Sequence, residues 1–141
     1  MSPDVALLIE ARPLSPIRRV RLLGELLAVY ARVRWLVRRR GVPATVEVLR
    51  NGVQDQHDAD VARSIGLRLA HIVERSLRPL PTDTRCLMRS LVLTGLLARR
   101  GVRSEIGIGA EPGETFQAHA WVEHGGRALA PTLGYAPLVR M

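Results

Sequence analysis

The hydrophobic pattern of this chain changes its period once, at Gly101, and this change limits the possible folds more than any other feature. Before Gly101, apolar residues recur every three or four positions, which is the spacing of one face of a helix. After it they alternate, most regularly over residues 116–123, which is the period of a strand. Helices followed by hairpin-connected strands predict an α+β fold with a short antiparallel sheet.

Helices are expected over residues 16–40, 43–50, about 58–77 and 86–100. Residue types that cap or stop helices stand at their ends. These are Ser15 and Pro16, Gly41, Asn51-Gly52, Asp58 or Asp60, Asp83 or Thr84, and Gly101. Strands are expected over residues 103–110, 116–123 and 127–130, with turns at 111–114 and 124–127, and the residues after Pro131 are expected to form a tail.

The first helix is expected to pack one apolar side against the core. The residues at that spacing are Ile17, Val20, Leu23, Leu27, Tyr30 and either Val33 or Val37. The arginines between Arg18 and Arg40 lie mostly elsewhere on the helix. We interpret them as a solvated face, and the alternative is a docking surface for an acidic partner or nucleic acid.

Length and composition indicate a single folded domain over residues 1–141, with 47% hydrophobic and 24% charged residues. Its helical part covers about residues 1–80, and the remaining part about residues 81–141. The first residues lack the basic start and the small-residue cleavage site of a signal peptide, and no apolar run is long enough to span a membrane. We therefore expect a cytoplasmic protein.

The formal charge of +8 at pH 7 comes from arginine alone, because the chain has no lysine. A complete absence of lysine is more typical of a compositional habit of the source genome than of a phosphate-binding face, so no nucleic-acid partner is expected. The single cysteine excludes an internal disulfide and a multi-cysteine zinc site, and no metal site is expected.

Cys86 and His119 have the clearest catalytic potential in the chain. Cys86 falls in the first turn of the fourth expected helix, and His119 lies within the strand expected over residues 116–123. The thiolate is the reactive form of cysteine, and a helix N-terminus and a facing imidazole both stabilise it. From spacing alone, a buried structural thiol and a non-catalytic histidine are the more common arrangement. The other histidines, His57, His71 and His124, are interpreted as structural or surface residues.

Several stretches together resemble the lasso peptide biosynthesis B2 protein family. They are residues 86–101, Ile106-Gly-Ile-Gly109, Phe116-Gln-Ala-His-Ala-Trp-Val-Glu123 and Tyr135-Ala-Pro-Leu138. The resemblance is close over the C-terminal half and looser over the helical N-terminal half. It implies a transglutaminase-like cysteine-protease core in residues 81–141, with the cysteine helix packed on the sheet and a helical N-terminal part that offers a partner docking surface.

The resemblance also implies an activity and partners. The family cuts the leader from a ribosomally made precursor peptide, Cys86 matches its nucleophile, and His119 matches its base. A separate leader-binding B1 protein and an ATP-dependent lasso cyclase are the implied partners. The use of ATP belongs to the cyclase, so no cofactor is assigned to this chain.

One position departs from the family pattern, which has an aspartate about twelve residues after the histidine. Ala130, Pro131 and Thr132 stand there, and no acidic residue follows Glu123. Glu123 shares a strand face with His119 but is expected about 13 Å away along the strand. We expect Thr132, a backbone carbonyl or a water to orient the imidazole. The alternatives are slow activity, an acid from a partner, or a catalytically weak scaffold of the maturation complex.

Gln117 and Trp121 flank His119 on the same face of the expected strand. Side chains two residues apart in a strand lie on one face, so both residues are candidates for lining the groove that holds the peptide. Ordinary packing is the alternative for each.

Overall fold

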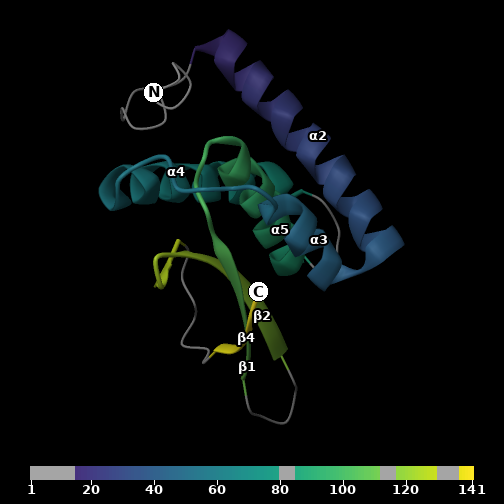
Figure 1. Ribbon diagram of the computed structural model, residues 1–141. Helices are drawn as coiled ribbons and strands as arrows, with labels where there is room; N and C mark the ends of the chain where they lie inside the picture. Colours follow the sequence, from purple (N-terminus) through teal and green to yellow (C-terminus); the bar gives the residue numbers. More distant parts are fainter. Residues whose placement is uncertain (1–14, 80–84, 112–116, 130–136) are drawn as a thin grey trace.

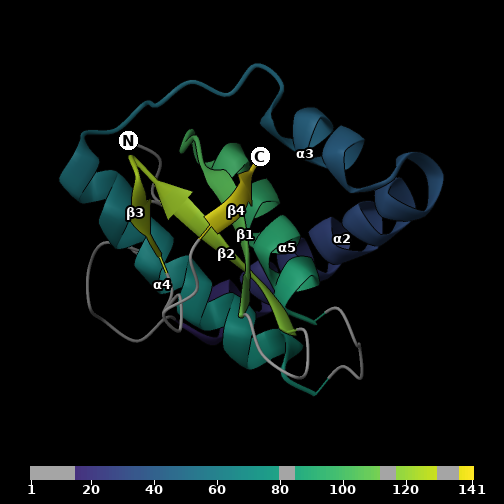
Figure 2. The same ribbon diagram turned by 90° about the horizontal axis from the view of Figure 1, so that it is seen from below.

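The computed structural model of the protein describes residues 15–79, 85–111, 117–129 and 137–141. Its helices are α2 (Pro16–Arg40), α3 (Val42–Arg50), α4 (Ala59–Leu77) and α5 (Arg85–Arg99). Its strands are β1 (Glu105–Glu111), β2 (Gln117–His124), β3 (Arg127–Ala128) and β4 (Pro137–Arg140). The helices gather on one side of the sheet (Figures 1 and 2), which confirms the predicted α+β class.

The helix boundaries follow the capping residues of the sequence. Ser15 and Asp58 each accept, through a side-chain oxygen, a hydrogen bond from the backbone N–H three residues later. After α5, Gly101 takes a φ of +70°, a conformation that glycine adopts without a steric cost. The N–H of Val102 then donates to the carbonyl of Leu97 at 3.0 Å, as in a glycine-terminated helix.

Helix α5 lies at the centre of the molecule and contacts α2, α3, α4, β1 and β2. Every residue from 91 to 97 is buried. A helix that is apolar on all sides is stable only inside a core, and this one is covered by helices and by the sheet. Cys86, near its N-terminal end, is only partly buried. The thiol of Cys86 therefore lies at the boundary between the core and the solvent-exposed surface.

The sheet has the order β3-β2-β1-β4, and neighbouring strands are antiparallel. Strand β4 is a correction, because the residues after Pro131 were expected to form a tail. Ile106 and Met141 exchange two backbone hydrogen bonds, of 2.7 and 2.8 Å, at the end of that pairing. The four residues of β4 are too few to show an alternating pattern, and only the exposed edge of β1 makes them a strand.

The core side expected for α2 is largely wrong. Its buried residues are Leu26, Val29, Val33 and Leu36. Ile17 and Val20 are 70% and 71% exposed, and Leu23 and Leu27 are about half exposed. Only the C-terminal half of α2 lies against α3 and α5, while the N-terminal half extends beyond them (Figure 1). The helix has two apolar stripes, and periodicity alone cannot tell which of them meets the core.

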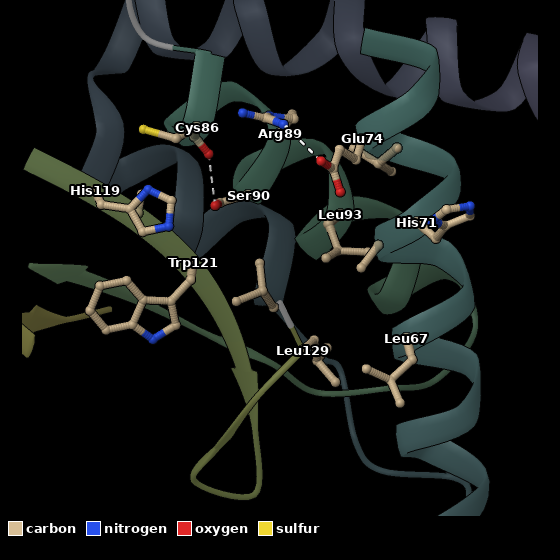
Figure 3. A pocket seen from close by; sticks show the side chains of 14 residues that line it. Leu67, His71, Glu74, Cys86, Arg89, Ser90, Leu93, His119, Trp121 and Leu129 are labelled. Carbon is tan, nitrogen blue, oxygen red and sulfur yellow. Dashed lines mark hydrogen bonds and ion pairs between the residues drawn. The ribbon is translucent and has the colours of Figure 1, made fainter. Parts of the chain in front are cut away.

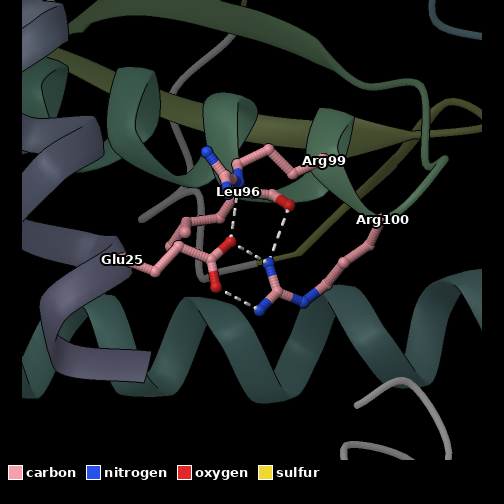
Figure 4. A network of polar contacts seen from close by, with 4 residues as sticks. All are labelled: Glu25, Leu96, Arg99 and Arg100. Atoms are coloured by element: carbon pink, nitrogen blue, oxygen red, sulfur yellow. Dashed lines mark hydrogen bonds and ion pairs between the residues drawn. The ribbon is translucent and has the colours of Figure 1, made fainter. Parts of the chain in front are cut away.

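A group of charged side chains fixes the middle of α2 to the end of α5 (Figure 4). Arg100 donates from Nη1 and Nη2 to the two carboxylate oxygens of Glu25, at 2.9 Å each. Arg99 lies 3.0 Å from the same carboxylate, and Nη1 of Arg100 also donates to the Leu96 carbonyl at 3.1 Å. Two parallel charge-assisted bonds set both distance and orientation, so the two helices are held in register.

Candidate active site

Two side-chain hydrogen bonds follow Cys86 along α5. Ser90, one turn later and buried, donates its hydroxyl to the Cys86 carbonyl at 2.8 Å. Thr94, one turn further, donates in the same way to the Ser90 carbonyl at 2.9 Å. The first backbone N–H groups of an α-helix have no acceptor within the helix. Cys86 therefore lies in the turn whose backbone N–H groups have no acceptor within the helix.

His119 stands in β2 and rests on Trp121. The two rings stack with centroids 5.9 Å apart and an interplanar angle of 26°. Trp121 is 2% exposed, and its Nε1–H donates to Glu123 Oε1 at 2.9 Å. Glu123 is itself buried, at 6% exposure. The carboxylate holds the indole, and the indole forms a plane against which the imidazole packs.

Gly107 explains how the indole can lie flat on the sheet. It is the β1 partner of Trp121 in the antiparallel register. A Cβ at this position would lie 2.6 Å from Cε2 of the indole, well inside van der Waals contact. A glycine in a strand often marks such a close approach.

Cys86 and His119 line the same pocket, of about 430 Å³, between α4, α5 and β2. Figure 3 shows both at one end of the pocket, with Leu67 and Leu129 at the other end. Most of the wall is apolar, from Leu67, Ala70, Val73, Leu93, Ala120, Val122 and Leu129. Ligand sites are commonly apolar hollows with a few converging polar groups, and this pocket has that character.

The remaining site residues of the sequence analysis are placed as follows. Trp121 lines the pocket and is also packed tightly, at 2% exposure, and its role in a peptide groove stays a prediction. Gln117 pairs with Glu111 at the end of the β1–β2 register. Thr132 lies outside the described residues. Glu123 bonds the indole of Trp121.

Sequence reasoning missed His71, Glu74 and Arg89, which also line the pocket. Glu74 Oε1 lies 3.9 Å from Arg89 Nη1, so α4 and α5 carry a loose ion pair at the rim. His71 is exposed, as expected, but it faces the pocket that holds Cys86. The sequence feature that could have identified His71 and Glu74 is helical spacing. Residues three and four positions apart on α4 share one face of the helix.

The other two histidines make structural hydrogen bonds. Nε2 of His57 donates to the Arg100 carbonyl at 2.9 Å, and Nδ1 of His124 donates to the Arg103 carbonyl at 2.7 Å. Both bonds tie neighbouring segments together.

A family model described as the transglutaminase-like superfamily matches residues 26–140. The chain belongs to the transglutaminase-like superfamily. The match begins within α2, so this transglutaminase-like domain includes the helices that precede Cys86 as well as the sheet. The superfamily includes cysteine-peptidase-like members. Comparison with curated proteins and with solved structures returned no match.

Within the described residues, no three His, Cys, Asp or Glu side chains come together in a way that could hold a metal ion. None of the described helices combines the length and the apolar character of a membrane span.

Proposed function

We propose that this transglutaminase-like protein is a cysteine endopeptidase that removes the leader from a ribosomally made lasso peptide precursor. The observation that carries the proposal is the shared pocket of Cys86 and His119, which come from different elements. The superfamily is compatible with cysteine-protease-type chemistry. The resemblance of residues 86–101 and 116–123 to the lasso peptide B2 family adds leader removal as the specific task.

In the first half of the reaction, Cys86 Sγ attacks the carbonyl carbon of the scissile amide while His119 takes the thiol proton. The oxyanion that forms receives hydrogen bonds from backbone N–H groups at the start of α5. The C–N bond then breaks, His119 gives its proton to the leaving amine, and the leader remains as a thioester on Cys86.

In the second half, His119 takes a proton from a water molecule that attacks the thioester carbonyl. The C–S bond breaks, the leader leaves as a carboxylic acid, and the thiol of Cys86 is restored by the proton from His119. Neither half of the proposed reaction requires a cofactor.

In this proposal Trp121 positions the imidazole of His119, and Thr132, a backbone carbonyl or a water completes its orientation. A thiolate–imidazolium pair depends less on a third charge than a serine hydroxyl does, and cysteine enzymes can work with a neutral third group. The precursor arrives with the leader-binding B1 protein, and the freed N-terminus passes to the lasso cyclase in the cytoplasm.

Cleavage of the precursor in the presence of the B1 protein, followed by mass spectrometry, tests the proposal. We expect Cys86→Ala to abolish the cleaved product and His119→Ala to reduce its rate by at least about 100-fold. His124→Gln is the matched control, because a glutamine amide can still donate to the Arg103 carbonyl. Undiminished leader removal by Cys86→Ala would instead support the scaffold alternative.

Alkylation by iodoacetamide tests the thiol in the isolated protein. If the pair is assembled, folded Cys86 reacts faster at neutral pH than in urea, and His119→Ala removes the advantage. If the folded thiol is inert, the pair of Cys86 and His119 is not assembled in the isolated protein. Repeating the measurement with the B1 protein then separates a buried structural thiol, which stays inert, from a site that the partner completes.

A further inference from the structure

A second hollow, of about 690 Å³, lies between α2 and α4 and adjoins the pocket of Cys86. We call it the α2–α4 groove. Its lining residues are Arg19, Leu22, Leu23, Arg68, His71, Ile72, Arg75 and Ser76. His71 lines both hollows, so the groove and the pocket of Cys86 adjoin at this residue of α4.

The groove combines an apolar surface with positive charge. Leu22, Leu23 and Ile72 supply the apolar part. Arg19 and Arg75 are exposed, one on each of the two helices. No Asp or Glu is among the described residues that line it. Arginine keeps its charge at any physiological pH, so the groove is permanently positive.

The apolar surface does not stop at the groove. Leu23 also belongs to the exposed stripe of α2 that was expected to be core, together with Ile17, Val20 and Leu27. Single exposed apolar residues are ordinary, but a row on one helix face with charges beside it is typical of a binding surface. Glu25, the acidic residue of this half of the helix, is already paired with Arg99 and Arg100.

We propose that the α2–α4 groove binds an acidic, aliphatic segment of the peptide substrate while the bond to be cut lies at Cys86. Opposite charge selects carboxylates for Arg19 and Arg75, and the leucines select aliphatic side chains. Because the two hollows adjoin at His71, one polypeptide that crosses α4 there can reach both. Binding at two linked sites raises the effective concentration at the second. This inference rests on the proposed peptidase function.

A nucleic acid fits the groove less well than an acidic peptide. Proteins that hold single strands stack bases on aromatic side chains. No Phe, Tyr or Trp is among the described lining residues of the groove, and its uncharged part is mostly aliphatic.

Binding is measured first with the inactive full-length Cys86→Ala protein, so that cleavage plays no part. The probe is a short fluorescein-labelled peptide of repeated Leu and Glu, followed by anisotropy. We expect Arg19→Glu with Arg75→Glu to weaken binding about tenfold or more. Arg34→Glu with Arg38→Glu is the matched control, because it changes the charge equally on exposed positions of α2 outside the groove.

If both pairs of substitutions weaken binding of the peptide equally, the proposed binding in the groove is wrong. Equal weakening would mean that the peptide is attracted unspecifically to a basic protein. Equal binding of a peptide with Ser in place of Leu would overturn the apolar part of the proposal. Displacement of the probe by a single-stranded oligonucleotide at lower concentration than by unlabelled peptide would favour a nucleic-acid partner.

Cleavage by the protein with an intact Cys86 separates this inference from the proposed function. With peptides that carry Glu and Leu beside a common cleavage sequence, the groove variant should raise KM about tenfold and leave kcat unchanged. If the groove variant cleaves the peptide with an unchanged KM, substrate binding in the groove is wrong, while the peptidase function stands. Absence of cleavage by the unsubstituted protein with its partners overturns the peptidase function, whatever the binding result.

Discussion

At the scale of single residues, Trp121 connects the sheet to the proposed base. Its indole is held by Glu123 on one side and stacks on the ring of His119. A packed aromatic plane limits the orientations of the imidazole that stacks on it. In the proposed peptidase, this contact is expected to help hold His119 in place.

Gly107→Ala tests this arrangement without touching Cys86 or His119. The new methyl group would lie 2.6 Å from the indole, so Trp121 must shift and the stacked imidazole must follow. We expect a loss of cleavage rate of about 10- to 100-fold and a loss of stability of about 1–3 kcal/mol. Rate assays and urea unfolding measure the two effects.

The matched control is Gly24→Ala, which replaces an exposed glycine of α2 with no atom within 4 Å of the new Cβ. It should leave the rate unchanged and stabilise the protein by up to about 1 kcal/mol. A wild-type rate in Gly107→Ala would show that the position of Trp121 does not matter for the reaction.

Thr132→Val tests the hydroxyl that is close in sequence to the position where the B2 family, which this chain resembles, has an aspartate. If that hydroxyl orients His119, the cleavage rate should fall about tenfold or more while the folded protein keeps its stability. Thr132→Ser, which keeps the hydroxyl, should retain most of the rate. A rate that is unchanged in Thr132→Val would assign the role to a backbone carbonyl or a water.

At the scale of elements, α5 sets the position of Cys86, and its surroundings set the position of α5. The helix is covered by α2, α3 and α4 on one side and by the sheet on the other. The bonds from Glu25 to Arg99 and Arg100 lie at its far end. They hold the C-terminal end of α5 against α2.

Glu25→Ala should therefore destabilise the whole fold. Arg100, whose side chain is 9% exposed, would lose both carboxylate bonds and keep a largely buried charge. We expect a loss of about 2–3 kcal/mol in the free energy of unfolding, measured by urea denaturation. Glu47→Ala, at an exposed position of α3, should change it by less than about 0.5 kcal/mol. Equal stability of the two variants would contradict the role of this contact.

At the scale of the whole molecule, residues from both ends of the described chain complete the domain. α2 supplies part of the core on α5, and β4 covers the edge of β1. An uncovered edge strand exposes a row of unpaired backbone groups and is a site of aggregation.

Removal of residues 137–141 should therefore lower stability and promote association. The variant loses the β1–β4 pairing and the two bonds between Ile106 and Met141. We expect a clear fall in the melting temperature and a concentration-dependent increase in particle size, measured by calorimetry and light scattering. Replacing only the side chain, in Met141→Ala, keeps the backbone pairing and should leave the protein monodisperse. A monodisperse, equally stable deletion variant would contradict the role of β4.

The local elements could be predicted from the sequence because their causes are local. Ser15 and Asp58 mark helix starts through their side-chain hydrogen bonds, and Gly101 marks a helix end because a residue without a Cβ adopts a positive φ freely. The change of period at Gly101 likewise separates helix from strand. Both patterns were confirmed, together with the α+β class.

Tertiary structure decided the features that depend on contacts between distant segments. The sequence by itself determined the four described helices and the strands β1 to β3. It also determined which thiol and which imidazole are candidates and, through its motifs, the superfamily. It could not determine which apolar stripe of α2 is buried, that residues 137–140 complete the sheet, or that His71 faces the pocket of Cys86. Those outcomes depend on the free energy of contacts between distant segments, which no local pattern contains.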